Sequence, residues 1–308
     1  MLKIYGKDKS GEWILLPYAQ SLSLKRDLSA PCDLLELVFC GDIGIEVLHL
    51  ELKDGDTFFR GIVDEQIVTF GTSPATKLVA RSEEALLSDN EACPEIFQNP
   101  SFELIFERYA KPCGIEKSEG ISGVYKGMHK VSKGMSCFEV IDTFCKGVYG
   151  VSPCVENRVL KLAKSSDNEL VFTTEESGGI EVCKAQVSYL PCKLISCVNV
   201  KTSPDGNYNT AIFDEEAKAT GICRQRYLDV SSLSAKSYGS AFELLGKARR
   251  KSCVLSLVCK GRFTDTLGLN AKARIFAKTY EGFVVSGVRY LRSKGKNETT
   301  VTLVKRGE

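Results

Sequence analysis

Histidine is the side chain best suited to proton transfer near neutral pH, and this chain of 308 residues has two, His49 and His129. His49 alternates with Ile45 and Val47 in a predicted strand, which favours a partly buried imidazole whose hydrogen bonds are satisfied. His129 lies in the glycine-rich stretch Gly120–Gly134 and is predicted to be exposed on a loop. Neither belongs to a G-x-S-x-G motif or a cysteine-protease signature, so the sequence indicates no nucleophile–base pair.

The thirteen cysteines could bind metal or carry out redox chemistry. No two of them form a C-x-x-C pair, and the closest two are Cys192 and Cys197. This spacing fits neither a zinc site nor a small disulfide framework. Four cysteines occupy positions of an apolar pattern: Cys137, Cys145, Cys253 and Cys259. Because a free thiol behaves there as a small hydrophobe, we predict structural thiols and keep metal or redox chemistry as the alternative.

Pairs of neighbouring carboxylates could supply the acid and base of a glycosidase. Five pairs are present: Asp54/Asp56, Asp64/Glu65, Glu83/Glu84, Glu175/Glu176 and Glu215/Glu216. Adjacent residues of a strand point to opposite faces, so such pairs are poor partners, and we expect them to keep the surface solvated. The glycines of Gly123–Gly134 do not form a G-x-x-x-x-G-K-[ST] loop. The sequence therefore predicts no catalytic, cofactor-binding or metal-binding residue.

The overall composition is that of an ordinary globular protein. Hydrophobic residues make up 43% and charged residues 26%, with 41 basic against 39 acidic side chains. A charge of +2 argues against a protein whose main task is to grip nucleic acid. No signal-peptide pattern is found, and the apolar run Cys253–Cys259 is too short to span a bilayer. We expect a soluble chain made in the cytosol, with about two domains.

The first eighty residues read as strands. Apolar and polar residues alternate in Ile45–Leu52, which predicts a strand. Lys53–Asp56 is predicted to form a hairpin turn that leads into a second strand, Thr57–Asp64. Further strands are predicted at Ile67–Phe70 and Lys77–Ala80. Together they predict a small antiparallel sheet or barrel.

Two amphipathic helices follow. The first begins at Asn99-Pro100-Ser101, with the proline expected in the first turn, and ends at Pro112 and Gly114. The second begins at Ser136 with Glu139 as a capping box and ends at Gly150. Ser101–Ile115 aligns with Cys137–Val151 without a gap, with identities that include the final glycines. A duplication and two ordinary amphipathic helices both explain this alignment.

The remainder returns to strands. Arg158–Lys164 and Glu169–Thr174 are predicted to form a hairpin around Ser165–Asn168. A helix is predicted between Ser234 and Ser252. The basic run Arg249-Arg250-Lys251 at its C-terminal end is interpreted as a favourable interaction with the helix dipole, in preference to a phosphate-binding site. The other predicted strands are Val182–Tyr189, Ile195–Lys201, Val254–Lys260, Lys272–Ala277, Phe283–Arg292 and Thr299–Lys305.

The predicted fold class is α+β and mainly β, with two β-barrel-like domains flanking a small α+β segment that contains the two amphipathic helices. The predicted domains are residues 1–83, residues 84–178 and, with one packed helix, residues 179–308.

Short motifs follow one another in a characteristic order over Arg60–Lys305. They are Arg60–Glu65 (RGIVDE), Leu78–Ser82 (LVARS), Ala85–Asn90 (ALLSDN), Asn99–Ile115, Gly134–Ile141 (GMSCFEVI), Leu267–Asn270 (LGLN) and Gly282–Tyr290 (GFVVSGVRY). Their order and spacing resemble the baseplate hub proteins of the late-control type, found in Mu-like and related contractile-tail phages, prophages and tail-like particles.

The resemblance implies a virion structural protein and not an enzyme. Hub proteins of this family form homotrimers whose two barrel-like domains per subunit make a pseudo-sixfold ring, which joins the tail tube to the central spike. The resemblance thus implies a place in the baseplate of the virion tail, assembly in the host bacterial cytoplasm, no cofactor, no membrane and no sequence-specific nucleic acid, although the genome could pass through the lumen. The alternatives are a tail-associated enzyme that degrades the cell wall, and a module that binds host-surface glycans.

Overall fold

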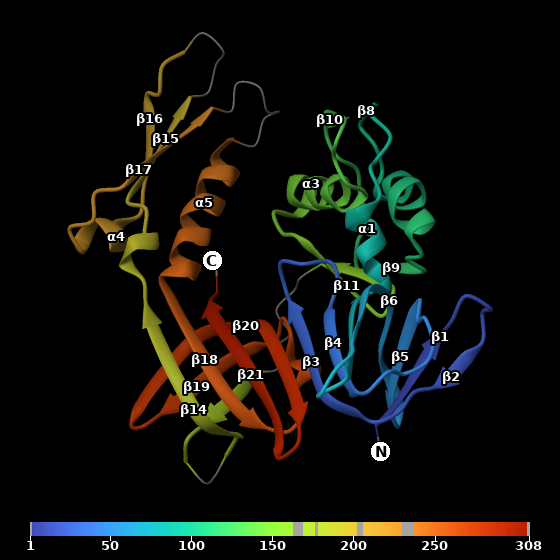
Figure 1. Ribbon diagram of the computed structural model, residues 1–308. Coiled ribbons are helices and arrows are strands. Elements are labelled where there is room, and N and C mark those ends of the chain that lie inside the picture. Colours follow the sequence, from blue (N-terminus) through green and yellow to red (C-terminus); the bar gives the residue numbers. More distant parts are fainter. Residues whose placement is uncertain (1, 163–168, 176–177, 202–205, 230–236, 307–308) are drawn as a thin grey trace.

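The computed structural model describes residues 2–162, 169–175, 178–201, 206–229 and 237–306. Its N-terminal part is a rolled antiparallel sheet of seven strands, hereafter the N-terminal sheet (Figure 1). The strands are β1 Lys3–Lys7, β2 Trp13–Leu15, β3 Ala19–Asp27, β4 Leu34–Cys40, β5 His49–Asp54, β6 Asp56–Thr69 and β7 Ala75–Ser82, in the order β3-β4-β7-β6-β5-β1-β2. Alternate residues such as Leu35, Leu37 and Phe39 of β4 fill its core.

The predicted turn between β5 and β6 is confirmed, because Gly55 has a φ of +83° and Asp54 pairs with Asp56. The prediction that the strand before it starts at Ile45 was wrong. The Gln66 side chain accepts a hydrogen bond from the Val47 amide and donates one to the Ile45 carbonyl. These bonds occupy backbone groups that a strand ladder would otherwise use, and β5 starts at His49.

The C-terminal part contains a closed barrel of six strands, hereafter the C-terminal barrel. Its strands are β13 Glu169–Thr173, β14 Ile180–Tyr189, β18 Cys253–Lys260, β19 Asn270–Ile275, β20 Lys278–Ser293 and β21 Lys296–Lys305. They pair in the order β19-β13-β14-β18-β21-β20, and β20 returns to β19. The core includes Phe172, Leu255, Leu257 and Val301, all fully buried. The prediction of a mainly β, α+β fold is confirmed.

The predicted hairpin around residues 165–168 was wrong. The strand β12 Val159–Leu162 pairs with β11 Pro153–Glu156 and, in parallel, with β9 Lys117–Glu119. By contrast, β13 pairs in parallel with β19 and β14. The two segments alternate in the way hairpin strands do, but their apolar faces are buried in different cores. The expected turn, residues 165–168, lies outside the described residues.

Both β layers belong to one hydrogen-bonded sheet of thirteen strands. The antiparallel pair β3–β20, from Gly287 opposite Asp27 to Ser293 opposite Ser21, joins the N-terminal sheet to the C-terminal barrel. Figure 1 shows the barrel and the sheet side by side, with the helices and the smaller sheets above them.

The helical segment, residues 83–162, packs above the N-terminal sheet (Figure 1). It contains η1 Glu83–Ala85, α1 Leu86–Asp89, β8 Glu95–Gln98, α2 Phe102–Ile105, η2 Phe106–Ala110, η3 Lys111–Cys113, β9, β10 Met128–Val131, α3 Cys137–Tyr149, β11 and β12. The capping box of Ser136 and Glu139 is confirmed, and Gly114 and Gly150 end the two helical stretches with φ of +85° and +74°. Ser101 caps the first stretch. Pro100 therefore precedes the cap, whereas the sequence predicted that this proline would lie in the first turn of the helix.

A small three-stranded sheet rises from the C-terminal barrel. Its strands are β15 Cys197–Lys201, β16 Thr210–Phe213 and β17 Gln225–Asp229, and α5 Ser237–Ser252 packs on one face through Ala241, Leu245 and Ala248. The remaining short helical segments are η4 Pro191–Lys193, α4 Glu215–Ala219 and, between β18 and β19 of the C-terminal barrel, η5 Thr264–Thr266. The domain boundaries at 83/84 and 178/179 stay a prediction. None of the helices in the described ranges is long and apolar enough to cross a membrane.

Candidate functional site

The structure places the two histidines in different surroundings. His49 is half-buried at the start of β5, as predicted. His129 was predicted to be exposed but is only 1% exposed. Alternation in β10 turns its imidazole inward, where ring centroids of Tyr125 and Phe144 lie 4.9 and 6.0 Å away. Because burial lowers the pKa of His129, this imidazole is neutral at physiological pH and serves as part of the aromatic core.

The cysteines act as predicted at the four positions of the apolar pattern. Cys137, Cys145, Cys253 and Cys259 are buried, and every cysteine is a free thiol. Burial raises the pKa of Cys145 and of Cys259 to about 12, so neither forms a thiolate readily. Within the described ranges, no three His, Cys, Asp or Glu side chains gather in a way that would hold a metal ion.

Most carboxylate pairs lie where charge is solvated or ion-paired. Asp54 and Asp56 bracket the β5–β6 turn, and Glu215 and Glu216 open α4. Asp64 binds Arg81 at 2.6 Å. Glu175 is exposed, and Glu176 lies outside the described residues. The described members of these pairs offer no acid–base pair across a cleft.

The pair Glu83/Glu84 departs from the prediction of a solvated edge. Glu84 is 8% exposed and accepts a hydrogen bond from the Arg158 amide at 3.0 Å.

Arg249, from the basic end of α5, forms an ion pair. It binds the buried Asp214, with Nε–Oδ2 and Nη2–Oδ1 distances of 2.6 and 2.8 Å. Asp214 in turn caps α4 by accepting from the Ala217 amide. That arginine therefore holds α4 against α5.

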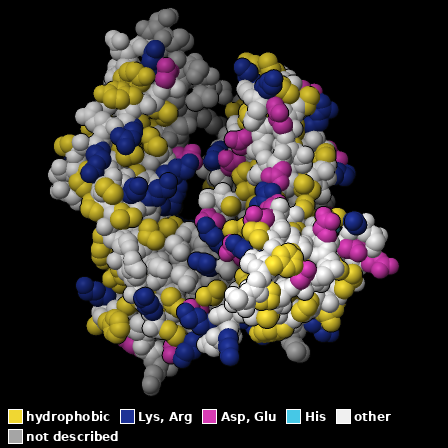
Figure 2. Space-filling model, in the orientation of Figure 1, with side chains coloured by type: hydrophobic (Ala, Val, Ile, Leu, Met, Phe, Trp, Pro, Cys, Tyr) yellow, Lys and Arg dark blue, Asp and Glu magenta, His cyan; other side chains and the backbone are white. Residues whose placement is uncertain are grey.

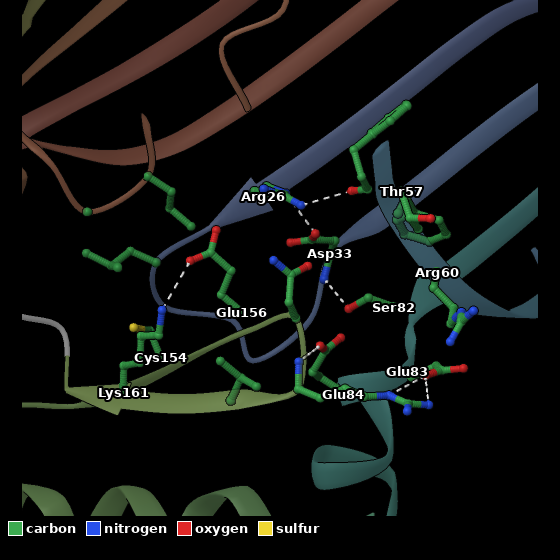
Figure 3. Close-up of a pocket in the computed structure, with 18 of the residues that line it drawn as sticks. Arg26, Asp33, Thr57, Arg60, Ser82, Glu83, Glu84, Cys154, Glu156 and Lys161 are labelled. Carbon is green, nitrogen blue, oxygen red and sulfur yellow. Dashed lines mark hydrogen bonds and ion pairs between the residues drawn. The ribbon is translucent and has the colours of Figure 1, made fainter. Parts of the chain in front are cut away.

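A cavity of about 670 Å³ lies where the N-terminal sheet, the helical segment and the C-terminal barrel meet. We call this region the joint. Figure 3 shows Arg26 and Asp33 projecting into it from the N-terminal sheet, Glu83 and Glu84 from the start of the helical segment, and Glu156 and Lys161 from β11 and β12. The turn Leu267–Leu269 of the C-terminal barrel completes the lining.

Arg26 lies at the centre of the joint. It occupies the inward face of β3, in register with Leu22 and Leu24, and is 8% exposed. Its Nε donates to Asp33 Oδ2 at 2.8 Å, and its Nη2 donates to the Phe58 carbonyl at 3.2 Å. Its Nη1 reaches the C-terminal barrel, where the Thr264 carbonyl accepts at 3.3 Å and Asp265 Oδ1 at 3.4 Å. One guanidinium thus ties together three elements that are far apart in sequence.

Asp33 is the half-buried partner of Arg26. Burial raises the pKa of Asp33 to about 6, and the guanidinium of Arg26 opposes this rise. Asp33 also donates its own amide to Ser82 Oγ at 3.0 Å. It therefore links β3, β4 and β7 at the rim of the joint.

A second arginine fastens the helical segment. Arg158 lies in the turn between β11 and β12 with φ of +62°. Its guanidinium donates to Glu83 and, at 3.0 Å, to Glu116 Oε1. Together with the bond from its amide to Glu84, this arginine connects β12, η1 and the loop before β9.

The charges around the cavity satisfy one another. Arg60 binds Glu51 at 2.8 Å, and Lys161 lies 3.5 Å from Glu119 and 4.0 Å from Glu156. Such mutual pairing fixes the relative positions of the parts, whereas a reactive site needs groups left available to a substrate. The sequence carried one signal that was missed: Arg26 occupies an apolar position of an alternating strand.

No protein-family model matches the chain, and no curated protein matches it. Solved structures do. A tail protein from Neisseria meningitidis is 15% identical with a TM-score of 0.78, over 99% of this chain and 97% of that one. The 43 kDa tail protein of prophage MuSo2 from Shewanella oneidensis is 14% identical with a TM-score of 0.77, over 98% of each chain.

A component of the Escherichia coli type VI secretion system, itself similar in structure to bacteriophage T4 tail proteins, is also similar. It is 12% identical with a TM-score of 0.58, over 100% of this chain and 77% of that one. At these identities the likeness shows the fold. This chain therefore has the fold of phage and prophage tail proteins, which agrees with the resemblance found in the sequence.

Proposed function

We propose that this chain is a structural hub protein of a phage, prophage or tail-like-particle baseplate, in which three copies form a ring that joins the tail tube to the central spike. The observation that carries the proposal is the joint. The pairing of β3 with β20 and the contacts of Arg26 fix two β units side by side within one chain. Three copies of such a two-unit chain supply six β units. Such a ring suits an adaptor between a sixfold tail tube and a threefold spike.

The chemistry of the chain supports a structural role. The joint's arginines and carboxylates are engaged with each other, and the His129 imidazole is enclosed by aromatic rings. The Neisseria and Shewanella proteins whose structures are similar to this chain are tail proteins. An adaptor functions through buried contacts between subunits and needs no titrating centre.

Light scattering on the purified protein tests the proposal. The expected mass is about three times the 33.9 kDa of one chain, and electron microscopy of that species should show a ring. Cross-linking of intact particles covers the case in which the ring forms only during assembly. Monomers in solution together with an absence of trimer cross-links in particles would refute the proposal. A zymogram should show intact peptidoglycan, and a cleared band would favour the cell-wall-degrading alternative.

A further inference from the structure

One hairpin turn of the C-terminal barrel is strained and presents an aromatic side chain to solvent. Ile275 pairs with Lys278, so the β19–β20 turn consists of Phe276 and Ala277. Both have positive φ, +43° and +60°, in a region that costs residues with a Cβ about 1 kcal/mol or more. Such two-residue turns normally use Asn-Gly. The Phe276 amide donates to Thr174 Oγ1 at 3.1 Å, but its ring is left in solvent, because the residue is 80% exposed.

The N-terminal sheet presents a similar aromatic side chain. Phe70, which follows β6 at the β6–β7 connection, is 77% exposed. These two phenylalanines are the most exposed large apolar side chains in the described part of the chain. Ile67, 42% exposed, lies on β6 three residues before Phe70. Each β unit thus has one phenylalanine that is more than three-quarters exposed, and aromatic side chains are common anchors of protein interfaces.

The charges around the two projections are opposite in sign. Arg274 and Lys278 flank Phe276 on β19 and β20, both exposed and, among the described residues, without an ion-pair partner. One exposed acid, Glu175, follows the Thr174 that accepts the Phe276 amide, so the basic residues outnumber it two to one. Near Phe70, Lys77 is neutralised by Glu36 at 3.1 Å. Glu65 on β6, five residues before Phe70, is exposed, and no described residue forms an ion pair with it.

The same asymmetry extends over the whole chain. Residues 1–83 carry 9 Lys and Arg against 13 Asp and Glu, a net charge of −4, whereas residues 179–308 carry 22 against 11, a net charge of +11. Figure 2 shows mostly basic side chains over the C-terminal barrel and the small sheet, and most of the acidic ones over the N-terminal sheet and the helical segment. Contacts between like ends of two copies would be repulsive, while a head-to-tail contact would be attractive.

We infer that the β19–β20 hairpin of one copy docks on the Phe70 surface of the next copy, where the Phe70 surface comprises Glu65, Ile67 and Phe70. This inference rests on the proposed ring and names its contact between subunits. Phe276 packs on the apolar side chains, and Lys278 approaches Glu65. Because the two surfaces differ, the contact is heterologous, and a heterologous contact repeated around an axis closes a ring.

The strain provides a test that separates binding from folding. Replacing the turn by Asn-Gly (F276N/A277G) removes both the strain and the aromatic anchor. We expect the variant to unfold at a temperature about 2–4 °C higher and to associate about 30-fold more weakly, measured by sedimentation over a dilution series. The control is Tyr227→Ser, which removes an aromatic side chain that is 64% exposed on β17 and should leave association unchanged.

Charge reversal identifies the partner surface. K278E and E65K should each weaken association, and the double variant K278E/E65K should restore most of it. Association of F276N/A277G equal to wild type, or failure of the double variant to recover, would overturn the inference while a trimeric wild type still supported the ring. A wild type that is monomeric in solution and in particles would instead refute the proposed ring, and the contact with it.

Discussion

Replacing Arg26 by methionine should destabilise the joint strongly. The change removes the cation next to the half-buried Asp33 and the donors for the carbonyls of Phe58 and Thr264. Removing one partner of a buried ion pair destabilises a protein by about 3–5 kcal/mol. Methionine refills part of the volume, so we expect a loss of about 4 kcal/mol in the free energy of unfolding at pH 8.

The loss should depend on pH in a defined direction. Burial holds the pKa of Asp33 near 6 even beside Arg26, and without that cation the pKa rises further. At pH 5 the variant can protonate Asp33 and so avoid a buried unpaired charge. The difference between variant and wild type should therefore be smaller at pH 5 than at pH 8.

Urea unfolding followed by circular dichroism measures the stability. Hydrogen exchange of the β3 and β20 amides shows whether the loss lies at the β3–β20 pair, which we call the seam. The matched control is Arg289→Met. Arg289 lies on the same seam opposite Lys25, is exposed, and donates one hydrogen bond to Ser23 at 3.2 Å. Its loss should change stability by less than about 0.5 kcal/mol. A loss below about 1 kcal/mol for Arg26→Met, or equal losses for the two variants, would refute the reasoning.

Three further results are expected. Because the pKa of Asp33 is raised in the folded state, stability should fall by about 3 kcal/mol as pH rises from about 4 to about 6, and Asp33→Asn, followed by urea titration at each pH, should abolish this fall. Gly61→Ala should destabilise the protein by about 3 kcal/mol, because a Cβ there would lie 2.2 Å from the Arg81 carbonyl oxygen. Gly246→Ala in α5 meets nothing closer than 3.8 Å and should stabilise the protein by about 0.5–1 kcal/mol. Thermal melts that rank the two variants the other way would contradict this. A thiol reagent should label the exposed Cys40 in the folded protein long before the buried Cys259, and mass spectrometry showing equal rates would contradict the structural role of that thiol.

The features predicted correctly are those in which neighbouring residues decide the structure. The capping box of Ser136 and Glu139, the stop at Gly150 and the glycine of the β5–β6 turn each depend on residues a few positions apart. The alternation in Cys253–Lys260 likewise fixes which face of β18 is buried. For the same reason the four cysteines of the apolar pattern were placed correctly.

The features missed depend on residues that meet only in the folded chain. A glycine-rich stretch around His129 suggested a loop, but pairing of β10 with β8 buried the imidazole. The segments β12 and β13 resemble a hairpin in sequence, yet each is buried against a different core. Arg26 reaches the Thr264 carbonyl across 238 residues, and no local pattern encodes such a contact.

The sequence by itself determined the mainly β character, the two helices with their ends, and the resemblance to phage tail proteins, because periodicity, capping and motif order are written in neighbouring residues. Only the tertiary structure decided that β3 joins β20, that Arg26 ties three elements together, and that Phe276 stays exposed on a strained turn. These features depend on backbone pairing and burial between distant segments, which local sequence does not specify.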